Sequence, residues 1–186
     1  KQVPTGEYNP FEEIKTNIVG SQNVVEATIA NNIEKVISLS TDKAVSPINL
    51  YGASKLCSDK LFISSNNIIG KKKISFSVVR YGNVMGSRGS VLPEFIKQNR
   101  EGYFKITDKR MTRFNILLPE AIEMEIWALD NAIGGEIIIP KIPSFKITDL
   151  AKSINSKLKF NILGIRKGEK IHEDLISKAD SPNTYD

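Results

Sequence analysis

Residues 35–55, KVISLSTDKAVSPINLYGASK, join an apolar run to a cluster of polar side chains and then to the start of a helix. The β-branched run from Lys35 to Ser40 predicts a short buried strand. The stretch from Leu50 to about Asn66 predicts a helix, with apolar residues along it. A strand that passes through polar residues into a helix is typical of an α/β protein.

The flanking sequence repeats this order. A cap and a proline open a predicted helix over about 10–31, and the run ISFSVVRY predicts a second strand over 74–81. Helix, strand, helix and strand in succession predict a parallel sheet with crossover helices. Such a sheet binds its ligands at the carboxyl ends of its strands, and the polar runs 40–43 and 80–90 both lie there.

After residue 90 the pattern becomes mixed, which suggests a smaller substrate-covering region. Short helices and strands alternate without a repeat or a low-complexity tract. The expected helices are 93–100, 119–131, 148–157 and 169–178, and the expected strands are 104–107, 113–118, 136–139 and 160–165.

Composition sets the class of protein. The chain has 186 residues, 40% of them apolar and 25% charged, which is ordinary for a globular protein. No apolar run approaches the roughly 20 residues of a membrane helix, and the polar start is not a signal peptide. The single cysteine, Cys57, favours a reducing compartment, and we therefore expect a cytoplasmic protein that binds no membrane. The chain starts with Lys1 rather than Met, which suggests a piece of a longer protein.

Charge indicates the kind of ligand. The formal net charge of +5 favours anionic partners, namely nucleic acid, phosphates or nucleotides. His172 is the single histidine, so no spacing rule predicts a metal site. Two basic groups suit a diphosphate, although solvated side chains at element ends explain them equally well. They are Lys109, Arg110 and Arg113, and Arg166, Lys167 and Lys170.

Two acid–base couples stand close together in the opening stretch. Tyr51 and Lys55 are spaced i, i+4 and share a helix face, where a nearby ammonium would lower the pKa of the phenol. A chance pair is the alternative, since this spacing alone is weak. Asp42 and Lys43 add an acid and an amine at the end of the strand, although a plain surface turn would also place them together. Two couples at one site suggest a reaction with two proton transfers.

Glycines follow the second strand. Gly82, Gly86 and Gly89 lie in YGNVMGSRGSVLP, between the strand and a helix, where a backbone can approach a phosphate. A plain turn is the alternative. Neither G-x-G-x-x-G nor G-x-x-x-x-G-K-S/T occurs in the chain.

These segments resemble the extended short-chain dehydrogenase/reductase family. STDKAVSPINLYGASK is similar to its catalytic segment, and RYGNVMGSRGSVLPEF to its nucleotide-sugar loop. More narrowly, the chain resembles the soluble inverting UDP-N-acetylglucosamine 4,6-dehydratases of pseudaminic acid biosynthesis. The similar runs are KQVPTGEYNPFEEIKTNIVGSQNV, LSTDKA, ITDKRMTRF, GGEIIIPKIPS and GIRKGEKIHE. Related polysaccharide-biosynthesis dehydratases often have methionine where Tyr51 stands, so the tyrosine favours the flagellar-sugar branch and flagellin glycosylation.

The resemblance implies a doubly wound parallel sheet, the C-terminal part of a Rossmann-like fold, with a small mixed α/β region. Residues 1–90 would be the second half of an NADP-binding domain with the catalytic residues, and 91–186 mainly a region that binds the nucleotide sugar. The family's glycine-rich N-terminal loop has no counterpart here, so the piece would lack much of its NADP site. Its sheet would expose an unpaired apolar edge.

The resemblance also implies roles. Tyr51 would take the proton of the sugar 4-hydroxyl while hydride passes from C4 to NADP⁺. Lys43 would then remove the C5 proton, and Asp42 would protonate the departing 6-hydroxyl. The return of hydride to C6 and of a proton to the opposite face of C5 would invert that carbon. The implied catalytic residues are Thr41, Asp42, Lys43, Tyr51 and Lys55; the cofactor residues are Ser40, Tyr51, Lys55, Tyr81, Gly82 and Val84; the substrate residues are Asn83, Val91, Arg113, Arg166 and Glu169.

The resemblance implies a UDP-sugar substrate, NADP or alternatively NAD, a homo-oligomer at full length and no nucleic acid partner. Two other functions stay open. A nucleotide-sugar epimerase or reductase of the same family would need Tyr51 and Lys55 but not Asp42 and Lys43. A non-catalytic nucleotide- or RNA-binding module would need none of them, and its binding would fall steeply with salt.

Overall fold

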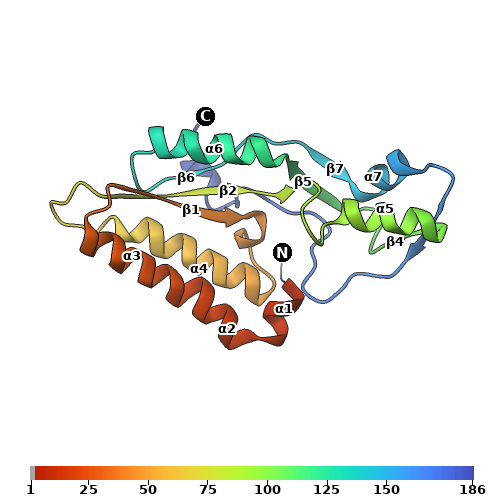
Figure 1. The fold of residues 1–186 in the computed structure, drawn as a ribbon, viewed down its shortest axis with the longest axis horizontal. Helices are drawn as coiled ribbons and strands as arrows, with labels where there is room; N and C mark the ends of the chain where they lie inside the picture. Colours follow the sequence, from red (N-terminus) through yellow and green to blue (C-terminus); the bar gives the residue numbers. More distant parts are fainter. Residues whose placement is uncertain (1–2) are drawn as a thin grey trace.

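A computed structural model describes residues 3–186, so the first two residues of the expected 1–90 region lie outside the described part. Figure 1 shows an elongated α/β molecule, with a sheet between helices at one end and a smaller group of helices and strands at the other. Among the described residues, no helix has both the length and the apolar character needed to cross a bilayer.

The larger sheet contains three parallel strands in the order β1-β2-β6. They are β1 (Lys35–Thr41), β2 (Ser75–Tyr81) and β6 (Ile137–Ile138). Thr41 pairs with Tyr81, so β1 and β2 end together and place the polar run after β1 beside the glycine run after β2. The predicted parallel sheet is confirmed. β1 is an edge strand of this sheet, as expected, and Leu39 on it is 44% exposed.

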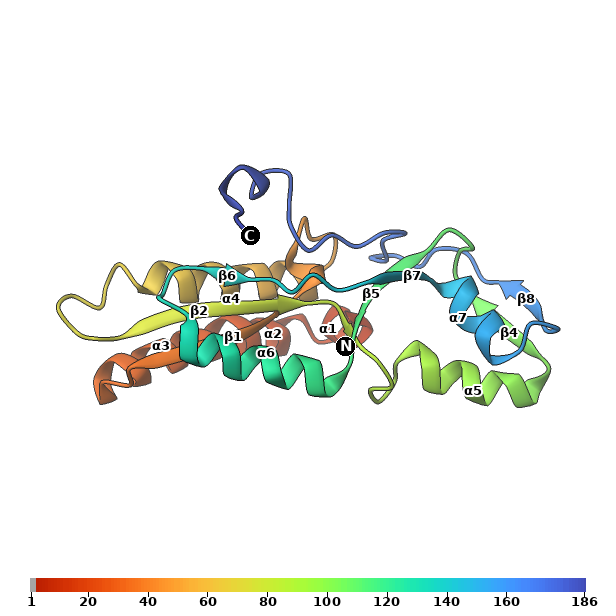
Figure 2. The ribbon, with the colours of Figure 1, turned by 90° about the horizontal axis from the view of Figure 1, so that it is seen from above.

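Helices cover both faces of this sheet, which makes it doubly wound (Figures 1 and 2). On one face lie α4 (Leu50–Ser65) and, beside it, α3 (Gly20–Asn31); on the other lies α6 (Leu118–Asn131). Phe76 and Val78 of β2 are fully buried and pack with Val25 and Phe62 of these helices. The sheet is therefore held by an apolar layer beneath it.

The predicted helix over 10–31 is continuous but changes its winding. It comprises α2 (Pro10–Ile14), a π-helical turn η1 (Lys15–Val19) and α3. A further helix, α1 (Val3–Tyr8), precedes it. The sequence gives little sign of α1, because it contains a proline and a glycine and both have low helix propensity.

The smaller region has its own core and two short sheets. In one, β5 (Thr112–Ile116) pairs parallel with β3 (Asn83–Val84) and antiparallel with β7 (Ser144–Lys146). In the other, β4 (Tyr103–Ile106) pairs parallel with β8 (Lys159–Ile162). These strands pack with α5 (Val91–Glu101) and α7 (Ile147–Ile154). The buried side chains that they share are Phe95, Phe104, Ile106, Met111, Ile147 and Ala151.

The chain crosses between the two regions more than once. Both α6 and β6 come from the second half of the sequence, yet they pack on or extend the larger sheet. The smaller region therefore contains only part of the 91–186 segment and also includes β3, which precedes that segment.

The predicted helix over 169–178 is wrong. This segment is irregular, and only the 3-10 turn η3 (Ser181–Asn183) follows it. The carbonyl oxygens that an α-helix would need have other donors. Ile171 O accepts from the backbone N–H of Thr112 (3.0 Å) and from Arg113 (3.1 Å), and Leu175 O accepts from Arg80 (3.2 Å).

Candidate active site

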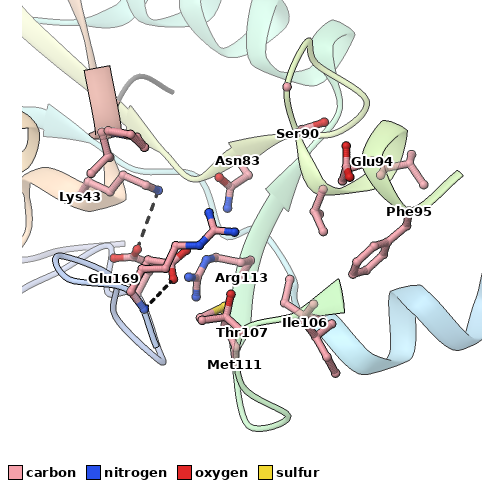
Figure 3. A pocket seen from close by; sticks show the side chains of 18 of the residues that line it. Lys43, Asn83, Ser90, Glu94, Phe95, Ile106, Thr107, Met111, Arg113 and Glu169 are labelled. Atoms are coloured by element: carbon pink, nitrogen blue, oxygen red, sulfur yellow. Dashed lines mark hydrogen bonds and ion pairs between the residues drawn. The ribbon is translucent and has the colours of Figure 1, made fainter. Parts of the chain in front are cut away.

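A cavity of about 770 Å³ lies where the carboxyl ends of β1 and β2 meet the smaller region. Figure 3 shows Lys43, Asn83 and Arg113 directed into the same space from three different elements. Seven of the residues expected to form the site line this cavity: Lys43, Asn83, Val84, Val91, Arg113, Arg166 and Glu169. These seven residues, far apart in the sequence, therefore surround one space.

The turn after β1 holds the acid and the amine together. Residues Asp42–Ala44 form a single 3-10 turn, η2, capped by Thr41, whose hydroxyl accepts from the Lys43 N–H at 3.3 Å. The same hydroxyl donates to Asp42 Oδ1 at 2.9 Å, and Lys43 Nζ lies 3.0 Å from that oxygen. Asp42 is fully buried, and its second oxygen, Oδ2, has no hydrogen-bond partner. Asp42 does not line the cavity, so Lys43 is the member of this couple that reaches it.

Tyr51 lies beside this turn but not on the wall of the cavity. Its phenol has a side-chain hydrogen bond with Thr41, which lowers the pKa of Tyr51. Burial first, and then the nearby Asp42 and Glu13, outweigh that hydrogen bond and raise the pKa of Tyr51 above its ordinary value. Tyr51 and Thr41 therefore do come together, as expected.

The expected effect of Lys55 on Tyr51 is wrong in this structure. Lys55 Nζ donates to the carbonyl oxygen of Leu39 at 2.7 Å, and Lys55 is not among the groups that shift the pKa of Tyr51. Burial lowers the pKa of Lys55 itself, against the opposing effect of Asp59 and Glu13. Spacing of i, i+4 places two side chains on one face, but the free carbonyl at the sheet edge competes for the amine.

The start of α4 fixes the distance between Tyr51 and the turn. Asn49 caps the helix by accepting from the Gly52 N–H at 2.7 Å, and its amide donates to Gly168 O at 2.9 Å. A Cβ on Gly52 would overlap the carbonyl oxygen of Lys43. The turn and the helix therefore touch at a point where only glycine fits.

Three residues expected to bind a cofactor have partners within the chain and do not line the cavity. The Ser40 hydroxyl donates to Asp59 at 2.6 Å. The Tyr81 hydroxyl donates to Glu125 at 2.9 Å, and burial together with this carboxylate raises the pKa of Tyr81 to about 12. Gly82 meets a packing need, because a Cβ there would lie 2.5 Å from Phe114 Cβ.

Arg113 both binds backbone carbonyls and lines the cavity. Its guanidinium donates to the carbonyl oxygens of Thr112 (2.6 Å), Ile171 (3.1 Å) and Lys170 (3.1 Å). A guanidinium has five N–H donors, so these three bonds leave two for a ligand. Arg166, Lys167 and Lys105 add positive charge to the same cavity.

Sequence reasoning missed three residues. Glu173 lines the cavity, although it lay within a segment expected to be helical. Glu13 acts on the pKa of both Tyr51 and Lys55 from the neighbouring helix, and no local pattern predicts that contact. Asn49 could have been found, because asparagine before a helical run is a common cap.

The family follows from a comparison with known proteins. A family model described as polysaccharide biosynthesis protein matches residues 1–186, and the chain belongs to this family. It is similar to a UDP-N-acetylglucosamine 4,6-dehydratase (inverting) of Campylobacter jejuni, with 56% identity over 100% of this chain and 56% of the relative. It is also similar to a UDP-glucose 4-epimerase of Rickettsia akari, with 43% identity over 100% of this chain and 56% of the relative.

Solved structures show the same fold. One is a dTDP-glucose 4,6-dehydratase from Streptomyces venezuelae with NAD and TYD bound, at a TM-score of 0.81 and 17% identity. The match covers 98% of this chain and 63% of that one. The chain spans about half the length of the curated relatives that it matches.

Proposed function

We propose that the whole protein is a UDP-N-acetylglucosamine 4,6-dehydratase that inverts C5 and makes a UDP-4-keto-6-deoxy-N-acetylhexosamine for pseudaminic acid or a related glycan. One observation carries this proposal. Lys43 lines the cavity and pairs with the buried Asp42, which Thr41 links to Tyr51, and an acid next to an amine is what the removal of water requires. The net reaction is loss of one water from the sugar, with the cofactor unchanged at the end.

Tyr51 and Thr41 would act at the sugar 4-hydroxyl. Thr41 is the one group that lowers the pKa of Tyr51, so it is the group that would favour the phenolate when the proton of the 4-hydroxyl is transferred. Thr41 also donates to Asp42. Its single hydroxyl proton would move from Asp42 to the Tyr51 oxygen as the phenolate forms, which couples the two acid–base pairs.

Asp42 and Lys43 would remove the elements of water. Lys43 in its neutral form would take the C5 proton, and Asp42 in its protonated form would donate to the leaving 6-hydroxyl. Oδ1 of Asp42, which lies 3.0 Å from Lys43 Nζ, is the atom that would carry this proton. A proton moved from Lys43 to Asp42 within the existing ion pair gives both forms at once.

The positive wall would hold the diphosphate. The two remaining donors of Arg113 and the exposed side chains of Arg166 and Lys167 lie on the same cavity. Asn83 and Val91, which line the same cavity, would contact the sugar, and Glu169 the uridine end. Guanidinium forks match phosphate geometry, which supports a nucleotide sugar as the substrate.

A nicotinamide dinucleotide would supply the hydride acceptor and donor for this chemistry, and we propose NADP. The chain fits this cofactor at the end of β1, because Lys55 donates one of its three N–H groups to Leu39 and has two left for a ligand. Ser40, Tyr81 and Gly82 support the strand ends there, and Val84 lines the cavity. We further expect a cytoplasmic homo-oligomer, with the thiol of Cys57 exposed and reduced.

The test is NMR analysis of the product that the full-length protein makes from UDP-N-acetylglucosamine in deuterated water. A 4-keto-6-deoxy product with inverted C5 carrying deuterium is expected, and Lys43→Ala should abolish it. An epimerase is the second candidate, since a relative with that name is 43% identical over the whole of this chain. A C4 epimer as the sole product, unaffected by Lys43→Ala, would establish the epimerase instead.

A further inference from the structure

The segment 170–173 is irregular but firmly attached to the site. Arg113 donates to two successive carbonyl oxygens, those of Lys170 and Ile171, each at 3.1 Å. The backbone N–H of Thr112 donates to Ile171 O at 3.0 Å, and the Thr112 hydroxyl lies 2.8 Å from Nδ1 of His172. Strand β5 thus holds this segment residue by residue.

The same segment reaches the catalytic turn. Lys170 Nζ donates to the carbonyl oxygen of Val45, directly after η2, at 2.6 Å. Glu173 Oε1 lies 3.8 Å from Lys43 Nζ, and Glu173 Oε2 lies 3.8 Å from Lys170 Nζ. Glu173 is only 8% exposed, and its Oε2 has no hydrogen-bond partner. A buried carboxyl is therefore aimed at the amine proposed as the base.

Lys43 is the only described lysine that forms an ion pair with two acids, Asp42 at 3.0 Å and Glu173 at 3.8 Å. The mechanism gives Asp42 a chemical task but leaves Glu173 without one. An opposite charge within about 4–6 Å favours the charged form of a group, and both carboxyls lie within that range of the Lys43 amine.

We propose that Glu173 is a positioning residue for Lys43: its carboxyl holds the amine at the cavity wall and sets the pH at which that amine becomes a base. This inference rests on the proposed function, in which Lys43 takes the C5 proton. A residue from a segment more than 120 positions further along the chain thereby tunes the reaction.

The surroundings of Glu173 support this role. The pKa of Glu173 is raised overall: burial raises it most and Asp42 raises it too, whereas Lys43, Arg113 and Lys170 lower it. These groups come from the catalytic turn, from β5 and from the segment of Glu173 itself. Lys170 lies at the same distance from Glu173 as Lys43 does, 3.8 Å, so the carboxyl lies between two amines.

The test compares Glu173→Gln with the wild type in the full-length protein. Loss of the negative charge should lower the pKa of Lys43, so the rising limb of the pH profile of kcat/KM should move down by about one pH unit. The maximum rate should fall because the amine is no longer held. Asp174→Asn is the matched control: it removes the same charge from the next residue, which is exposed, and should leave the profile unchanged.

A direct readout keeps this inference separate from the proposed function. NMR titration of lysines labelled at Cε, with the Lys43 signal identified by its loss in Lys43→Arg, gives the pKa of Lys43 without any turnover. A wild type that makes no 4-keto-6-deoxy product would overturn the proposed function. The titration would still show whether Glu173 affects the pKa of Lys43. Glu173→Asp, which keeps the charge but retracts it, should give an intermediate pKa, and it serves as the test if Glu173→Gln does not fold. A Lys43 pKa that is the same in the wild type and in the variants would overturn the inference.

Discussion

The contact between the catalytic turn and α4 gives the sharpest prediction, for Gly52→Ala. Gly52 is buried in the first turn of α4. A Cβ there would overlap the carbonyl oxygen of Lys43 and lie 3.0 Å from Pro47 Cβ, at or inside the 3.0 Å limit that real Cβ atoms keep. The substitution therefore pushes on the backbone that carries the proposed base.

Two effects of opposite sign decide the size of the change. Alanine is a better helix former than glycine by about 0.5–1 kcal/mol. Extra volume in a packed site costs about 1–3 kcal/mol, and the obstacle is a backbone carbonyl that cannot rotate away. The net expectation is a loss of about 1–2 kcal/mol in the free energy of unfolding. A shift of the turn by about 1 Å should also lower kcat about 100-fold.

Urea unfolding and steady-state kinetics of the full-length protein measure both effects. Gly20→Ala is the matched control, because Gly20 has helical dihedral angles (φ −59, ψ −42) and its Cβ would lie 3.5 Å from Lys15 O, an ordinary contact. This control should gain about 0.5–1 kcal/mol and keep full activity. If Gly52→Ala gains stability to the same extent and keeps its kcat, the close packing argued here is not what holds the turn.

Other perturbations test the surroundings of the site. Asp59→Asn should lower the free energy of unfolding by about 3–5 kcal/mol in urea, because it leaves the buried Arg80 without its carboxylate at 3.0 Å. The pKa of Tyr81 is raised to about 12, so its contribution to stability is fully present below about pH 10 and is lost as the pH rises through 12; Tyr81→Phe should remove that alkaline loss from a series of unfolding curves. Thr41→Val removes the hydrogen bond that lowers the pKa of Tyr51, so kcat should fall about 10- to 100-fold and the pH optimum should rise; an unchanged pH profile would exclude this role of Thr41.

Local pattern predicted much of this molecule, and the reason is visible in particular elements. The strand 35–41 contains a β-branched run, and the helix 50–65 begins at an asparagine cap, so their positions needed no knowledge of distant residues. The parallel order then placed Lys43 and Asn83 at one edge, and both do line the cavity. Register and crossover geometry bring strand ends together regardless of the side chains.

What the sequence could not show depends on partners far along the chain. Lys55 satisfies a carbonyl at the sheet edge instead of acting on Tyr51, and spacing alone cannot tell these outcomes apart. The segment that was expected to be a helix over 169–178 has its carbonyls bound by arginines 58 and 95 residues away. Helical periodicity is a local signal, and such distant donors override it.

Two arginines explain how an irregular segment can position a side chain as well as a strand does. Arg113, on β5, holds the carbonyls just before Glu173, and Arg80, on β2, holds the carbonyl of Leu175 just after it. Arg80 is in turn held by the buried Asp59 of α4, so this set of contacts also connects the segment to α4. Because Glu173 lies between these two attachment points, its distance to the proposed base is set by both sheets at once. Arg113 would therefore affect kcat through Glu173 as well as KM through the diphosphate, and the two roles share one guanidinium.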